Sequence, residues 1–374
     1  MRKLIVFLII LALGSALIIK ADIASYFQHE GSNKEVRKAQ PTQKESSFKP
    51  TQDIEEGEVE ENTVPKSKTL INDYHIFQSF NNCGPAAFSM ALSYYGINES
   101  QQKLGQELRP YQNPQGDNDD KSVTLQELAD KSKDYGLTPF RRPNGNMELI
   151  KHFIALDIPV ITRTWLKVDD DIGHYRVIKG YNDMEKTLIQ DDSLQGKNLT
   201  YSYDELNELW KKFNYEYLIL VPREKVNKIT KLLGEDNEKK AWEKAIQNTL
   251  AELEKSPDNI DARFNLSVAY YNVGNYQKSV EEFEKVEDKL SMRTLWYQVE
   301  PILAYYELKN YERVLSISER ILNNNNRAFT ELYILRGDIF KEQGKQEQAK
   351  QEYQKAVFYN VNNKTAQEKM AEYR

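Results

Sequence analysis

The 374-residue sequence contains a single cysteine, Cys83, and only four histidines. One cysteine excludes an intrachain disulfide, and no group of Cys and His residues stands at the close spacing of a zinc site. The net charge is −6, with no basic stripe of the kind that binds nucleic acid. We therefore expect neither a metal nor a cofactor, and no nucleic-acid partner.

What the sequence does have is an unusual setting for its one cysteine. Asn81-Asn82 precedes Cys83, Gly84-Pro85 follows it, and apolar residues then recur at helical spacing as far as Gly96. This pattern predicts a helix that begins at Cys83, where the helix dipole and unpaired N–H groups favour a thiolate. A lone cysteine is more often a small buried apolar residue. Such a residue needs no Asn-Asn before it and no Gly-Pro after it, so we interpret Cys83 as a nucleophile.

A nucleophilic cysteine needs a base, and the base needs a group to orient it. His174 begins a predicted strand that runs to Tyr181, and a hairpin turn leads to a second strand that ends at Asp191-Asp192. The hairpin can bring either carboxylate beside the imidazole. We favour Asp192 over Asp191 because it precedes the turn Ser193–Gly196. The amide of Gln78 can donate to an oxyanion beside the Cys83 backbone N–H.

Helices come first in this region and a mostly antiparallel sheet comes second, which predicts an α+β domain over residues 69–224. The acidic loop that holds Asp117, Asp119 and Asp120 does not have the residue pattern of a calcium loop, because Lys121 takes a ligand position. We interpret it as a solvated loop.

Residues 70–222 resemble papain-like cysteine peptidases of the bacteriocin-processing type, which cut leader peptides after a double glycine. They are most similar to the free-standing bacterial relatives that are not fused to a transporter. The resemblance rests on Gln78, the Asn82–Ala86 segment, the His174–Tyr181 strand and the Asp192-Ser193 turn. It implies that Cys83 is the nucleophile, His174 the general base, Asp192 the orienting group and Gln78 part of the oxyanion hole.

Two features depart from the family pattern. The orienting Asp commonly precedes a Pro in the family, whereas Ser193 stands there in this chain. The oxyanion Gln is usually one position earlier, where this chain has Phe77. Asp191 therefore stays an alternative to Asp192.

The N-terminus has the pattern of an exported protein. Met1-Arg2-Lys3 is basic, and the run from Leu4 to Ile19 carries no charge. We expect residues 1–25 to form an uncleaved signal anchor, which we favour over a cleaved signal peptide, and residues 26–68 to form a polar, disordered stalk. Positive charge stays inside, so the folded domains are expected outside the cell membrane, or secreted if the segment is cleaved.

The C-terminal part, residues 238–374, repeats itself. Tyr270–Tyr276 matches Tyr305–Tyr311 at an offset of 35, and Phe340 and Gly344 begin a third copy. A period near 34 with these small and aromatic positions is typical of tetratricopeptide repeats, which stack helix pairs. The middle copy is the weakest, with Lys309 and Val314 at small-residue positions. Such arrays resemble modules that bind proteins, although packing on the peptidase domain or dimerisation is the alternative.

These features together predict a membrane-anchored extracytoplasmic cysteine peptidase of papain-like fold with a tetratricopeptide repeat domain for a protein partner. One alternative is an inactive binding scaffold on the same fold. Another is a thiol acyltransferase, because an acyl-enzyme serves both outcomes and only the acceptor differs. The sequence indicates neither the peptide substrate nor the scissile bond.

Overall fold

The computed structural model describes residues 64–111, 123–234 and 237–373. The predicted anchor and nearly all of the predicted stalk lie outside these ranges, as does most of the acidic loop. Within the described ranges, no helix is both long enough and apolar enough to cross a membrane.

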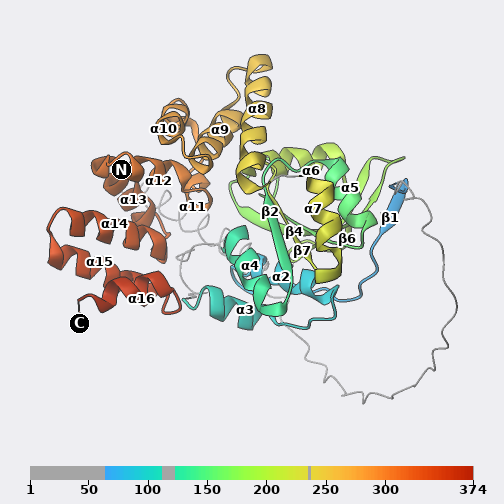
Figure 1. Cartoon of the computed structure of the whole chain (residues 1–374), viewed down its shortest axis with the longest axis horizontal. Helices are drawn as coiled ribbons and strands as arrows, with labels where there is room; N and C mark the ends of the chain where they lie inside the picture. The colour runs from blue at the N-terminus through green and yellow to red at the C-terminus, as the bar shows by residue number, and fades with distance from the viewer. Residues whose placement is uncertain (1–63, 112–122, 235–236, 374) are drawn as a thin grey trace, which may run out of the picture. The chain divides into compact units, whose positions relative to one another are not determined.

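A seven-stranded antiparallel sheet forms the centre of the first domain (Figure 1). Its strands follow the order β2-β7-β3-β4-β5-β6, and β1 pairs with β4 off this path. The strands are β1 (Ser67–Thr69), β2 (Thr138–Arg142), β3 (Val160–Trp165), β4 (Gly173–Asn182), β5 (Thr187–Asp192), β6 (Gly196–Ser202) and β7 (Tyr217–Val221).

Helices cover both faces of this sheet. The helices of this domain are α2 (Cys83–Ser93), α3 (Gln101–Leu108), α4 (Leu125–Ser132), α5 (Met147–Ala155), α6 (Tyr203–Trp210) and α7 (Val226–Leu233), with 3₁₀ turns η1 (Lys133–Tyr135), η2 (Lys211–Phe213) and η3 (Arg223–Lys225). Alternate residues of the strands face two cores. Ile161 and Val177 pack with α2 and α4, whereas Val160 and Ile178 pack with α5, α6 and α7. Thr124 and Glu127 form a capping box at the start of α4.

Three strands, β1, β2 and β6, are not predicted from the sequence, because none of them has a clear strand pattern. β2 contains Pro139, which is tolerated because β2 lies at an edge of the sheet. β1 is only three residues long, and it pairs with β4 from Ser67 onward. β6 begins at Gly196, inside the predicted turn. At the other end, α7 packs its Ile229 into the sheet core.

The second domain is all helical. This confirms the prediction that an α+β domain is followed by an all-α domain. It consists of α8 (Glu238–Lys255), α9 (Ile260–Asn272), α10 (Tyr276–Glu284), η4 (Glu287–Lys289), α11 (Thr294–Tyr297), α12 (Glu300–Glu307), α13 (Tyr311–Asn323), α14 (Thr330–Glu342), α15 (Gln346–Tyr359) and α16 (Lys364–Ala371). The repeated pairs are α9–α10, α12–α13 and α14–α15.

The same left-handed turn joins the two helices of each pair. Gly274 and Gly344 have φ of 84° and 73° there, and Lys309 takes the equivalent position with a φ of 59°. A lysine adopts this conformation less readily than glycine. This substitution explains why the middle repeat is hard to recognise from sequence although its backbone is the same.

Candidate active site

Cys83 is the first residue of α2, as the Gly-Pro pattern predicts. The chain reaches it through a turn in which the Asn82 N–H donates to the carbonyl of Ser79 at 3.1 Å. Gln101, at the start of α3, holds the segment that leads into this turn. Its Oε1 accepts from the Ser79 N–H at 2.9 Å, and its Nε2 donates to the carbonyl of Phe77 at 2.7 Å. The loop before the cysteine is therefore fixed by a second helix.

Gly84 lets the beginning of α2 pack closely against β4. A Cβ at this position would lie 3.3 Å from the Cβ of Val123 and 3.4 Å from the ring of Tyr175. The Tyr175 hydroxyl in turn donates to the carbonyl of Val123 at 2.7 Å. Glycine at position 84 is thus favoured by close packing as well as by helix initiation.

His174 stands at the second position of β4, beside the end of β5. Its Nε2 lies 2.9 Å from Oδ1 of Asp192, and the two side chains are only 1% and 0% exposed. Cys83, itself 6% exposed, interacts with the His174 side chain closely enough for that side chain to lower the pKa of its thiol. Because Nε2 faces the carboxylate, Nδ1 is the ring nitrogen left for the thiol. The structure therefore brings Cys83, His174 and Asp192 together, with the imidazole of His174 in contact with the Asp192 carboxylate.

Asp192 is held from several directions. Its Oδ1 also accepts from the backbone N–H groups of Leu194 at 2.7 Å and Gln195 at 2.9 Å. Its Oδ2 forms an ion pair with Arg176, at 3.3 Å from Nε, without the alignment of a hydrogen bond. These donors all favour the ionised carboxylate.

Arg176 is a site residue that sequence reasoning missed. Its side chain is completely buried, and its Nη atoms donate to the carbonyls of Trp165 at 3.0 Å and Leu166 at 2.7 Å and to the hydroxyl of Thr164. An arginine between apolar residues of a central strand, two positions after His174, is the pattern that could have found it. A buried cation there requires a buried anion.

The charges of the site lower the pKa of Asp192 and raise that of His174. Burial opposes ionisation of Asp192, but the hydrogen bond and charge of His174, the charge of Arg176 and the Gln195 N–H outweigh it and lower its pKa to about 2. Burial likewise lowers the pKa of His174, whereas Asp192 and Cys83 raise it by more, so that the net shift is upward.

The pKa of the Cys83 thiol shifts downward, opposite to the shift of His174. Burial raises the pKa of Cys83, but the hydrogen bond and charge of His174, the charge of Arg109 and the Gly84 N–H bring it below its usual value. Arg109 follows α3, and its guanidinium donates to the carbonyl of Asn81. No sequence pattern pointed to Arg109. The result is a pair that favours thiolate and imidazolium.

Asp191 has a different environment. Lys179 Nζ lies 2.7 Å from its carboxylate, and both side chains are buried. Its Oδ1 accepts from the Asn198 N–H at 2.9 Å. In the choice that the sequence leaves open, Asp192 is the carboxylate that contacts His174.

Gln78 is tied to the residue after Asp192. Its backbone N–H donates to the carbonyl of Ser193 at 2.8 Å, and its side-chain Oε1 accepts from the Ser193 hydroxyl at 2.8 Å. Because its oxygen is engaged, the NH₂ group is the end that can donate to a bound substrate. The serine that departs from the family pattern thus orients the displaced glutamine.

The other histidines lie apart from the thiol chemistry. His75 Nε2 is 2.9 Å from the backbone carbonyl of Asp192 and so supports the turn. His152 is half-exposed, with Nδ1 2.8 Å from the carbonyl of Glu148. His29 lies outside the described residues. Within those residues, no group of three or more His, Cys, Asp and Glu is placed to hold a metal ion.

Comparison with known proteins points to the same two parts. Residues 67–218 match the model of the Peptidase_C39 like family. Residues 260–288 and 330–357 match that of the tetratricopeptide repeat. No curated protein matches the chain.

Among solved structures, a Bacillus anthracis protein described as a C39-like peptidase is 16% identical, with 44% of this chain and 96% of that chain covered and a TM-score of 0.34. The peptidase domain of Streptococcus ComA, a bifunctional ABC transporter involved in quorum sensing, is 21% identical, with 40% and 97% covered and a TM-score of 0.32. MamA is 18% identical, with 35% and 76% covered and a TM-score of 0.32.

Proposed function

Because this chain joins a domain of the Peptidase_C39-like family to tetratricopeptide repeats, we propose that it is a cysteine peptidase that hydrolyses a peptide or protein through Cys83, His174 and Asp192. The observation that carries the proposal is the buried chain of contacts from the thiol through the imidazole to the carboxylate, with Nε2 of His174 2.9 Å from Asp192. Each member of that chain has its pKa shifted toward the form that the chemistry requires.

The reaction follows from these positions. The Cys83 thiolate attacks the carbonyl carbon of the scissile peptide, and the electron pair of the C=O bond moves to oxygen. The imidazolium of His174 gives its proton to the departing amine as the C–N bond breaks, which leaves an acyl-enzyme. Water then attacks the thioester while His174 takes its proton, and Cys83 leaves as thiolate. Asp192 stays ionised and orients the ring.

In this proposal, two N–H donors near the N-terminus of α2 stabilise the oxyanion. The Cys83 N–H is one of the unpaired donors at the helix N-terminus, and the NH₂ group of Gln78 is the second donor. Gln78 is anchored through the Ser193 hydroxyl at 2.8 Å, so its amide does not need to be oriented at the moment of reaction.

The alternative is a binding scaffold, and one observation favours it. Cys83 and His174 are 6% and 1% exposed, so a peptide can reach the thiol only after a neighbouring segment moves. The test must therefore report the chemistry of Cys83 itself.

Iodoacetamide labelling of the whole chain, followed by intact mass from pH 5 to 10, provides that test. Cys83 is the only thiol that can be labelled, because it is the only cysteine. An ordinary thiol has a pKa of about 8.5. Labelling of the wild type should persist well below that pH, and the labelling profile of His174→Ala should move to higher pH. The urea-unfolded wild type gives the unperturbed reference. A folded wild type that follows this reference would contradict the peptidase proposal and favour the scaffold.

The substrate class requires a second step. A mixture of synthetic peptides, some with a double-glycine site, would be incubated with wild type and with Cys83→Ala. Cleaved peptides that appear only with wild type support hydrolysis. Transfer of the acyl group to an added amine, without hydrolysis, would support the acyltransferase alternative.

The location is proposed from the sequence. The basic start and uncharged run of residues 1–25 support an anchor, with the folded domains outside. Protease treatment of intact cells should then remove the repeat domain. Protection of that domain in intact cells, with digestion after lysis, would contradict the proposed orientation.

A further inference from the structure

The segment between the first and second repeats contacts the peptidase domain beside the catalytic histidine. It contains the short helix α11, which ends at Tyr297. Gly173, the residue before His174, lies directly under the tyrosine ring. A Cβ on Gly173 would be only 2.8 Å from Cε1 of Tyr297. The ring occupies the space that a side chain would fill, so the start of β4 is covered by a residue of the repeat domain.

Aromatic and cationic groups fix the Tyr297 ring in this position. Its centroid lies 5.5 Å from that of Trp165, the β3 residue paired with Gly173, and 6.2 Å from that of Phe213. Arg163 donates from Nη2 to the Tyr297 carbonyl at 2.7 Å, with its guanidinium 5.6 Å from the ring centroid. Strand β3 and the 3₁₀ turn η2 thus both contribute to holding Tyr297.

Contacts on each side of Tyr297 pin the segment. Arg293 forms an ion pair with Asp171 at 2.5 Å, and its backbone N–H donates to the same carboxylate at 3.3 Å. Gln298 donates from Nε2 to the carbonyl of Lys212 at 3.0 Å. The segment is therefore bound along its length, and Tyr297 is not a single incidental contact.

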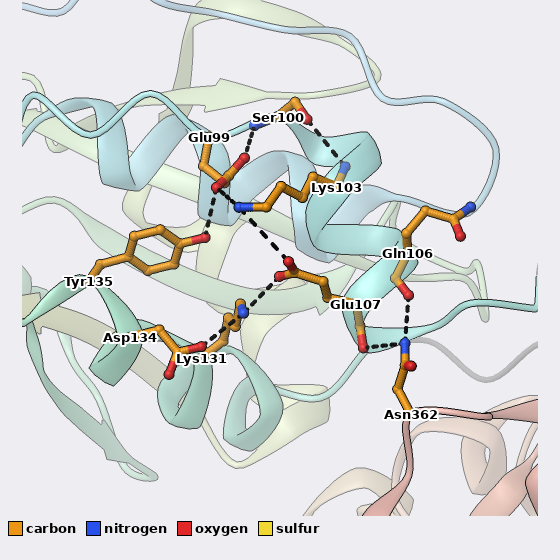
Figure 2. A network of polar contacts seen from close by, with 9 residues as sticks. All are labelled: Glu99, Ser100, Lys103, Gln106, Glu107, Lys131, Asp134, Tyr135 and Asn362. Carbon is orange, nitrogen blue, oxygen red and sulfur yellow. Dashed lines mark hydrogen bonds and ion pairs between the residues drawn. The ribbon is translucent and has the colours of Figure 1, made fainter.

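A second part of the repeat domain contacts the cysteine side of the site. Asn362 donates to the carbonyls of Gln106 at 2.9 Å and Glu107 at 3.2 Å, at the C-terminal end of α3 (Figure 2). Asn360 donates to the carbonyl of Leu108 at 3.2 Å. Arg109 follows immediately and donates to the carbonyl of Asn81, two residues before Cys83. Residues of the repeat domain thus contact the segments that hold both Cys83 and His174.

Tyr297 is also within electrostatic reach of the thiol. Burial raises the pKa of Tyr297 to about 12, and the charge of Cys83 adds to this rise, which a Gly173 backbone hydrogen bond partly offsets. The ring therefore borders the site in which the thiolate forms.

We propose that Tyr297 is a positioning residue for His174, so that the repeat domain completes the catalytic site of the peptidase domain. His174 is the second residue of its strand, where a strand end opens readily unless it is packed. The ring of Tyr297 closes that end over Gly173 and keeps the imidazole between Cys83 and Asp192. This inference rests on the proposed peptidase function, since it assigns Tyr297 a role only in that chemistry.

The test compares the pH profile of Cys83 labelling in the whole chain for Tyr297→Ala, Tyr297→Phe and wild type. Tyr297→Ala should reduce labelling at pH 6 by about tenfold or more, because a thiol that loses its imidazolium returns toward a pKa of about 8.5. Tyr297→Phe keeps the ring over Gly173 and should keep the wild-type profile. Tyr305→Ala is the matched control: this tyrosine is equally part of the repeat core but contacts Glu284 instead.

Thermal unfolding of each variant separates positioning from general stability. Tyr305→Ala should lower the melting temperature and leave the labelling profile in place. A folded Tyr297→Ala with the wild-type profile would overturn the inference. If that variant does not fold, Gly173→Ala addresses the same contact from the other domain, and an unchanged profile there would overturn it equally.

Failure of the underlying function appears elsewhere in the same experiment. If wild type already follows the His174→Ala profile, the dyad itself does not form, and both proposals fail. If wild type and His174→Ala differ while Tyr297→Ala matches wild type, the peptidase chemistry stands and only the role of the repeats is overturned.

Discussion

Arg176 and Asp192 form an ion pair, Nε to Oδ2, at 3.3 Å, with both side chains 0% exposed. The pair joins the orienting carboxylate to the carbonyls that end β3, because Arg176 donates to Trp165 and Leu166 as well. A buried ion pair is costly to break because the remaining charge has no solvent. The buried guanidinium of Arg176 thus keeps the Asp192 carboxylate in place beside His174.

Removal of Arg176 should destabilise the fold. Arg176→Met removes the cation beside the buried Asp192 carboxylate and the donor to the carbonyls of Trp165 and Leu166. We expect a loss of about 3–5 kcal/mol in the free energy of unfolding. Urea denaturation measures this loss. The control is Arg263→Met, which breaks a partly exposed pair with Glu282 at 3.1 Å and should cost about 0–1 kcal/mol. Equal losses in the two variants would contradict the role of Arg176.

The two neighbouring aspartates should respond differently to amidation. Asp192→Asn removes the charge that raises the pKa of His174, so the pH profile of Cys83 labelling should move upward. Asp191→Asn breaks the buried contact with Lys179 and should lower stability while the profile stays in place. A shift with Asp191→Asn alone would reverse the assignment.

Gln78 should matter for acyl transfer but not for alkylation. Hydrolysis of p-nitrophenyl acetate passes through an oxyanion, and loss of one oxyanion donor in Gln78→Ala should reduce the Cys83-dependent rate by about 100-fold. Alkylation by iodoacetamide forms no oxyanion, so its rate should not change. Ser193→Ala frees the Gln78 oxygen and should give an intermediate rate. A parallel loss in both reactions would indicate a structural role instead.

Glu300 should make stability depend on pH near neutrality. Its Oε2 is buried with no hydrogen-bond partner among the described residues. Burial and the charge of Glu216 raise its pKa to about 7, and Arg141 and Arg163 only partly oppose this. The folded state therefore binds its proton more tightly than the unfolded state, whose pKa is about 4.3. The stability that the protonated carboxyl provides is complete below that value and is lost as pH rises toward 7.

The variant that tests this is Glu300→Gln. It should be more stable than wild type above pH 7, by about 1–3 kcal/mol, and similar to wild type near pH 4. Urea denaturation at both pH values measures the difference. Glu307→Gln, an exposed position on the same helix, should show no such dependence on pH.

Gly337 should not tolerate a side chain. A Cβ there would overlap the ring of Tyr353 across α14 and α15, so Gly337→Ala should cost about 1–3 kcal/mol through overpacking. The double variant with Tyr353→Leu should lose less than the sum of the two single variants, because the smaller side chain removes the overlap. Additive losses in thermal or urea unfolding would contradict this contact.

The sequence by itself determined the local features. The helix that begins at Cys83 follows from Gly84-Pro85 and the apolar spacing, and the repeats follow from a period of 35 that returns at Gly274 and Gly344. These features depend on residues close in sequence or on identical units. The α+β order followed from the same local patterns.

Only the tertiary structure decided which groups meet. Asp191 and Asp192 are adjacent in sequence and point to opposite partners, Lys179 and His174, because neighbouring strand residues face opposite sides of the sheet. The contact of Tyr297 with Gly173 joins residues more than a hundred positions apart. No local pattern encodes such a contact, since it depends on how two complete domains pack against each other.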